Sequence, residues 1–156
     1  MKCYNYINYL NKSGIVSNNL LNEIFDDVDT RIEINFSDNL PLGFNKFGAI
    51  GVTLFKRIYF LNRFKFLDPF EQIAIIRHEL EHIQQQNKHG LFFYILYLCE
   101  WVIHFIKLLF SSPISKFRTL PNIAYHLISF EKSAYLIENK TKILLINESN
   151  YDKSNY

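Results

Sequence analysis

The sequence predicts a single α+β domain, in which a small β-sheet packs on one long polar helix and on further helices. Three observations predict this class: polar and apolar residues alternate over 31–36, a segment with marked ends spans 69–89, and Leu, Ile, Phe and Tyr dominate 91–110. A chain of 156 residues with 49% hydrophobic content can form one core and is too short for two comfortable domains.

Three parts of this single domain are expected: an N-terminal helical and strand extension (1–40), the core (41–140) and a C-terminal segment or tail (141–156). Within the first two, residues 1–30 are typical of one or two short helices. A sheet is expected over 31–61, where the apolar runs after the first strand form two more strands or one long bent strand.

The helix expected over 69–89 has signals at both ends. Asp68 is placed to cap it, Pro69 stands at the first helical position and Glu71 at the third, which together resemble a capping box. Gly90 stands where a left-handed residue ends many helices. Between these ends, one apolar stripe recurs at spacings of three and four: Ile73, Ile76, Leu80 and Ile83.

The same helix carries the run His78-Glu79-Leu80-Glu81-His82, which matches the pattern H-E-x-x-H. His78 and His82 lie one helical turn apart and away from the apolar stripe, so both imidazoles can reach one zinc ion. Glu79 would act as the general base toward a zinc-bound water, as in other zincins. Glu81 is a competitor that spacing does not exclude, but the order of the motif favours Glu79. The expected fold is therefore zincin-like.

Residues 91–110 form a second notable segment, whose twenty residues would just cross a bilayer. Glu100, His104 and Lys107 fall inside it, and ionisable groups are costly at membrane depth. We therefore prefer a central buried helix, or one that contacts a protein partner or a second copy of the chain, over a membrane anchor.

A catalytic zinc ion usually takes three protein ligands, and two downstream glutamates compete for the third place. Glu100 lies in the apolar segment, where pairing with His104 is the alternative to ligation. Glu131 falls in the first turn of a helix expected at 130–139, with Ser129 as its cap. Ala134 is small enough for that helix to approach the first closely. We favour Glu131, and Tyr135, one turn later, could direct its hydroxyl at a developing oxyanion.

Composition excludes some classes of function. A formal net charge of +2 with scattered basic residues gives no indication of nucleic-acid binding. Cys3 and Cys99 have neither CxxC nor paired spacing, and the first residues lack the apolar core of a secretory signal. An intracellular protein is expected, or a virion component if a phage encodes it.

Parts of the chain resemble a known family. Residues 77–86 resemble the H-E-x-x-H-x-x-Q-Q helix of small gluzincin-like metallopeptidases. Residues 124–135 are similar to the A-Y-R-N-x-x-F-E-x-E-A-Y segment of short proteins from bacteroidete bacteria and their phages. The likeness covers roughly residues 45–140. The order of the segments, with an apolar helix between the histidines and the glutamate, also resembles that of membrane-sensor metalloproteases.

The resemblance implies zinc held by His78, His82 and Glu131, with Glu79 as the base. Two positions depart from the family pattern: His126 stands where Arg is frequent, and Ser133 where Glu is frequent. The expected function is zinc-dependent hydrolysis of peptide bonds in a peptide or protein substrate. The alternatives are a non-catalytic structural protein on a zincin scaffold, such as a phage-particle component, and a peptidase anchored in a membrane through residues 91–110.

Overall fold

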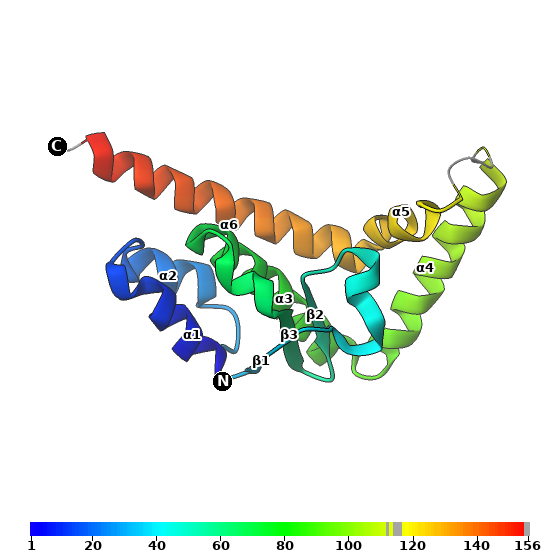
Figure 1. Ribbon diagram of the computed structural model, residues 1–156, viewed down its shortest axis with the longest axis horizontal. Coiled ribbons are helices and arrows are strands. Elements are labelled where there is room, and N and C mark those ends of the chain that lie inside the picture. Colours follow the sequence, from blue (N-terminus) through cyan, green and yellow to red (C-terminus); the bar gives the residue numbers. More distant parts are fainter. Residues whose placement is uncertain (112, 114–116, 155–156) are drawn as a thin grey trace.

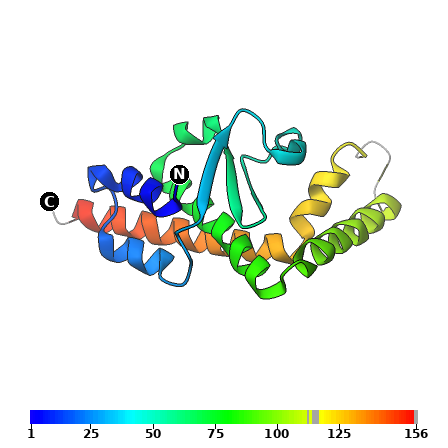
Figure 2. The same ribbon diagram turned by 90° about the horizontal axis from the view of Figure 1, so that it is seen from below.

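The computed structural model describes residues 1–111, 113 and 117–154. This part of the chain contains six α-helices and one three-stranded sheet, which confirms the mixed α+β class. The long helices and the sheet lie in layers, with α3 (Pro69–His89) between the sheet and α6 (Ser129–Ser154) (Figures 1 and 2).

Two short helices, α1 (Cys3–Leu10) and α2 (Asn18–Phe25), begin the chain as expected. Ser17 caps α2, because its hydroxyl accepts a hydrogen bond of 3.2 Å from the backbone N–H of Leu20. Both helices contribute buried side chains to the main core, which also takes residues from β1, β3 and α3. The first forty residues therefore belong to the same core as the rest.

The sheet consists of β1 (Glu33–Ser37), β2 (Gly51–Leu54) and β3 (Arg57–Leu61), in the order β1-β3-β2. β1 runs parallel to β3, and β2 runs antiparallel to it. The apolar runs after the first strand thus form a hairpin of two strands. Phe55 and Lys56 make its turn with φ of 48° and 60°, the backbone conformation that a tight two-residue hairpin needs. Short 3₁₀ turns at Asn11–Ser13, Pro41–Phe47 and Asn62–Phe66 complete the connections.

Helix α3 has the bounds that its sequence signals predict. Pro69 is its first residue, and Asp68 Oδ1 accepts a 2.8 Å hydrogen bond from the backbone N–H of Phe70. Gly90 ends it with φ 59° and ψ −139°, so φ is positive as expected while ψ lies outside the left-handed helical region. The expected apolar stripe is buried, with Ile73, Ile76, Leu80 and Ile83 all at most 2% exposed.

Helix α4 (Phe92–Ser111) is not the buried central helix that its composition led us to expect. Among its residues, Phe93 alone is buried. One face of α4 packs on α5 (Leu120–Leu127), and the pair extends away from the sheet at one end of the molecule (Figures 1 and 2). The expectation failed because composition reports how apolar a helix is, whereas its burial depends on which other elements reach it. By length and composition α4 could cross a membrane.

Helix α6 is much longer than the expected ligand helix at 130–139. It continues through the segment expected as a tail as far as Ser154, while residues 155 and 156 lie outside the described part. Toward its end Glu148 accepts 3.3 Å hydrogen bonds from the backbone N–H of Ser17. Before α6 in the chain, α5 begins at Leu120, and residues 114–116 lie outside the described part.

Candidate metal centre

Three buried side chains meet where α3 lies against the start of α6. His78 and His82 come from α3, and Glu131 comes from the first turn of α6. His78 Nε2 lies 3.5 Å from Glu131 Oε2, and His82 Nε2 lies 3.2 Å from Glu131 Oε1. One ligand atom from each of the three residues falls within 4.8 Å of the others. The group could therefore hold one metal ion.

Local sequence explains why these groups converge. The spacing of four residues places both imidazoles on one face of α3, with ring centroids 5.0 Å apart. Ala134, one turn after Glu131, is fully buried, and its small side chain permits the close approach of the two helices. The structure thus brings Glu131 beside the two histidines with which the sequence analysis grouped it.

The donor set fits a divalent cation. Glu131 Oε2 is buried, and no hydrogen-bond partner reaches it among the residues that the structure describes. A buried oxygen without a partner is costly, and a cation between it and the two Nε2 atoms would remove that cost. Two imidazoles and one carboxylate are also the ligand set of many catalytic zinc sites.

The outer ring nitrogens contact groups that hold the imidazoles in place. His82 Nδ1 lies 2.9 Å from Gln85 Oε1, and Gln85 Nε2 donates to the carbonyl of Phe130 at 3.1 Å. His78 Nδ1 lies 3.0 Å from Glu138 Oε2, an ion-pair contact whose geometry does not make a hydrogen bond. Such contacts favour a proton on Nδ1, so a metal would take the place of the proton on Nε2.

Sequence reasoning missed both of these supporting residues. Gln85 belongs to the segment that resembles the metallopeptidase motif, but it had been given no role. Glu138 lies seven residues after Glu131, which is two helical turns, so helical spacing alone could have placed both carboxylates on one face.

The charges of the group are strongly coupled. Burial lowers the pKa of His78, but the carboxylates of Glu131 and Glu138 outweigh it and raise the pKa to about 10. Burial likewise opposes a charge on His82, and Glu131 raises its pKa. Burial favours a protonated Glu131, yet the two histidines hold its pKa well below the ordinary range. Without a metal, the group pairs a carboxylate with protonated imidazole.

Glu79 lies beside this group, and its position distinguishes it from Glu81. Its carboxylate is buried and accepts a 2.7 Å hydrogen bond from the hydroxyl of Thr53 on β2. Burial raises the pKa of Glu79 above its usual value. Glu81 instead lies 3.6 Å from the guanidinium of Arg77 and 3.5 Å from the hydroxyl of Ser133. Only Glu79 of these two carboxylates lines the cleft described below.

Glu100, the other candidate for the third ligand, is engaged elsewhere. It accepts 2.6 Å hydrogen bonds from the backbone N–H and the hydroxyl of Ser129. Ser129 is the first residue of α6, so its hydroxyl joins α4 to the beginning of α6. Glu100 thus pairs with Ser129 and not with His104, the partner that the sequence analysis expected.

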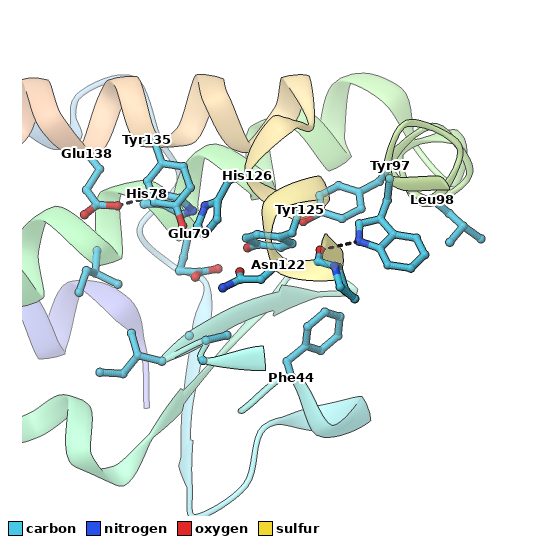
Figure 3. A pocket seen from close by; sticks show the side chains of 17 residues that line it. Phe44, His78, Glu79, Tyr97, Leu98, Asn122, Tyr125, His126, Tyr135 and Glu138 are labelled. Atoms are coloured by element: carbon cyan, nitrogen blue, oxygen red, sulfur yellow. Dashed lines mark hydrogen bonds and ion pairs between the residues drawn. The ribbon is translucent and has the colours of Figure 1, made fainter. Parts of the chain in front are cut away.

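A cleft of about 490 Å³ opens beside His78 and Glu79 (Figure 3). The Glu79 carboxylate points into the cleft, and Asn122 and Tyr125 of α5 line it as well (Figure 3). Aromatic and apolar side chains make up most of the remaining wall: Phe44, Tyr97, Leu98, Trp101 and Tyr135. The cleft is therefore mainly apolar, with its charged groups gathered at one place.

Tyr97 links the cleft wall to the candidate metal centre. Its hydroxyl donates a 2.5 Å hydrogen bond to Glu131 Oε1. Burial and the nearby carboxylate raise the pKa of Tyr97 far above its ordinary value, so the phenol keeps its proton. No sequence signal identified this tyrosine, because it is one of many aromatic residues in an apolar helix.

Comparison with protein-family models, with curated proteins and with solved structures finds no match to this chain.

Proposed function

We propose that the chain is a zinc-dependent metallopeptidase. The observation that carries the proposal is the convergence of His78, His82 and Glu131, whose ligand atoms lie within 4.8 Å of one another beside a buried glutamate and a cleft. Two imidazoles and one carboxylate leave a coordination position free, as hydrolytic zinc sites require. Imidazole donors favour zinc over calcium or magnesium, which prefer oxygen ligands.

His78 and His82 would bind the ion through Nε2, and Glu131 through its carboxylate. When bound, zinc acts as a Lewis acid that polarises a carbonyl group and lowers the pKa of water to about 7. Gln85 and Glu138 hold the two imidazoles in the orientation that binding needs.

Glu79 would accept the proton of the attacking water and deliver it to the leaving amine. Its raised pKa suits this task, because a base whose pKa lies closer to neutrality can both take up and release a proton. The hydroxyl of Thr53 fixes one carboxylate oxygen by a 2.7 Å hydrogen bond and leaves the other for the water.

The cleft supports a preference for peptides with a bulky apolar side chain near the cleaved bond. Its wall combines Trp101, Tyr97 and Leu98 with few charged groups. Tyr135 lies on the same wall, with its ring centroid 4.7 Å from that of His78. Burial raises the pKa of the Tyr135 phenol, which would keep its proton and donate it in a hydrogen bond to the reacting carbonyl oxygen.

The test compares wild type with Glu79→Gln on a library of fluorogenic peptides after loading both with zinc. We expect equal zinc content by elemental analysis and cleavage by the wild type alone. His78→Ala serves as the second variant and should lose both zinc and cleavage. Equal cleavage by wild type and Glu79→Gln would refute the proposal, as would the absence of zinc binding by the folded wild type.

A further inference from the structure

Helix α4 has two faces of different chemistry. Four of its polar side chains turn toward the body of the protein and bond there: Tyr94 to Gln86 at 3.1 Å, Tyr97 to Glu131 at 2.5 Å, Glu100 to Ser129 at 2.6 Å, and Trp101 to the carbonyl of Pro121 at 3.2 Å. These bonds remove the objection that Glu100 makes α4 unsuited to a lipid environment, because its charge is directed away from the outer face.

The outer face is apolar along the length of the helix. It includes Phe92, Ile95, Val102, Ile103, Ile106 and Phe110, which are between 37% and 86% exposed. With the exposed Cys99 between Ile95 and Val102, positions 92, 95, 99, 102, 106 and 110 follow one another at spacings of three and four and form one stripe, and Ile103 lies beside it. Twenty residues at about 1.5 Å each make this stripe about 30 Å long, and soluble proteins rarely expose an apolar surface of that extent without a partner.

The segment that contains this face carries a net positive charge. Residues 88–128 contain four basic residues and a single acidic one, Glu100, whose carboxylate is turned inward. The rest of the chain holds 13 of the 17 basic and 14 of the 15 acidic residues, so the excess positive charge belongs to the α4 and α5 region. Lys88, Lys107 and Arg118 are exposed there.

We propose that the outer face of α4 docks on the surface of a lipid bilayer that contains anionic lipids, with the helix lying in the plane of the membrane. An apolar stripe buried among acyl chains, with basic residues at the level of the headgroups, is the arrangement of interfacial helices. The inner face cannot enter lipid as well, because it is bonded to α5 and α6, so α4 lies on the bilayer and does not cross it.

A second copy of the chain is a weaker fit to the same face. Interfaces between proteins favour Tyr, Trp and Arg and carry hydrogen bonds across them. On α4 the tyrosines and the tryptophan turn inward, and aliphatic side chains dominate outside. The hydrocarbon of a bilayer offers no hydrogen-bond partner, and the stripe requires none.

Docking would also place the cleft near the membrane. Leu98 is 60% exposed and lines the cleft (Figure 3). Trp101 of the same helix lines it as well. A substrate that lies at the bilayer surface would therefore reach the cleft from the side of α4.

The experiment is vesicle flotation with the full chain, purified without detergent. Vesicles of phosphatidylcholine with phosphatidylglycerol are compared with phosphatidylcholine alone. The test variant is Ile103→Gln with Ile106→Gln. Its matched control is Ile143→Gln with Ile146→Gln on α6, an isoleucine pair with the same spacing and similar exposure. Neither pair changes the net charge, and circular dichroism checks that both variants fold.

We expect wild type and the α6 pair to float with anionic vesicles, and the α4 pair to bind about tenfold less, because two half-exposed isoleucines no longer enter lipid. Wild type should bind less to vesicles of phosphatidylcholine alone, because these carry no anionic lipid to attract the basic residues near α4. A wild type that does not float would overturn the proposal, as would equal loss in both pairs. A dimer that dissociates only in the α4 pair, without flotation, would assign the face to a second copy instead. The readout needs neither metal nor peptidase activity.

Discussion

Glu138 Oε2 lies 3.0 Å from Nδ1 of His78, the ring nitrogen opposite the one that faces Glu131. The same carboxylate accepts a 2.7 Å hydrogen bond from Lys142, one turn further along α6. Helix α6 thus supplies both a candidate ligand and the group that orients another. The position of His78 depends on two carboxylates seven residues apart on one helix.

Replacing Glu138 with Gln should weaken zinc binding by about 10- to 100-fold, as loss of a partner to a metal-binding histidine commonly does. The amide is nearly isosteric, but it no longer bears the negative charge that favours a proton on Nδ1. Competition against a chromophoric chelator measures the affinity. Glu148→Gln, on the same helix and far from the site, should bind zinc as wild type does. Equal affinities in all three proteins would show that Glu138 does not support His78.

The two glutamates between the histidines should differ sharply in their effect on catalysis. Glu79 is buried beside the cleft, whereas Glu81 contacts Arg77 and Ser133. Glu79→Gln should lower kcat by about a hundred- to ten-thousand-fold, the usual contribution of a general base. Glu81→Gln should leave kcat nearly unchanged and lower the melting temperature slightly, since Arg77 loses one of its two acidic partners. A large loss of kcat in Glu81→Gln would reverse the assignment.

Zinc binding should release protons. The pKa of His78 is raised to about 10 in the metal-free site, so this imidazole is protonated at pH 7, and a metal must displace its proton. Affinity should therefore rise as the pH increases from 6 toward 9. Calorimetry in buffers of different ionisation enthalpy should detect release of about one proton per zinc ion at pH 7. Affinity that is independent of pH over this range would contradict the coupling.

The free energy of unfolding of the metal-free chain should fall as the pH rises above neutrality, whereas zinc affinity should rise. A raised pKa on His78 contributes stability that is fully present below its ordinary value of 6.5 and is lost as the pH rises through about 10. The lowered pKa of Glu131 contributes stability above its ordinary value of 4.5, which is lost at lower pH. Urea denaturation of the metal-free chain should give the highest free energy of unfolding between about pH 4.5 and 6.5. His78→Gln should flatten the alkaline side of this profile.

Local signals predicted the parts of the site that lie within one helix. Asp68, Pro69 and Gly90 mark the bounds of α3 because caps act through their immediate neighbours. The spacing of His78 and His82 fixes their common face for the same reason. Glu131 could be favoured over Glu100 because the small residue Ala134 follows it by three positions. In the structure Ala134 is buried where α3 and α6 meet.

The features that sequence reasoning missed depend on contacts between distant elements. The exposure of α4 follows from its packing, which is mainly on α5 and reaches α3 and α6 at a few side chains, and composition does not record this. The length of α6 depends on α2 and α3, which support it beyond the segment that resembles a known motif. Tyr97 has its role because α4 passes Glu131, thirty-four residues later in the chain.

Gly51 of β2 lies against both the core and Glu79, the candidate base. A Cβ atom there would come within 2.6 Å of the Phe60 ring and 2.9 Å of Glu79 Oε1. Phe60 is fully buried and stacks on Phe64 with ring centroids 3.9 Å apart, so it has little room to move. Gly51→Ala should therefore lower the free energy of unfolding by about 1–3 kcal/mol and displace the Glu79 carboxylate.

Gly51→Ala should displace Glu79 and leave the three candidate ligands in place. The carboxylate of Glu79 is not among the three candidate ligands, so Gly51→Ala should reduce kcat severalfold or more and leave zinc affinity close to wild type. Gly14→Ala is the control, because its positive φ also makes alanine unfavourable but no atom lies within 4 Å of the added Cβ. That variant should lose stability and keep its kcat. If Gly51→Ala instead keeps wild-type kcat and melting temperature, the contact between β2 and Glu79 does not constrain the base.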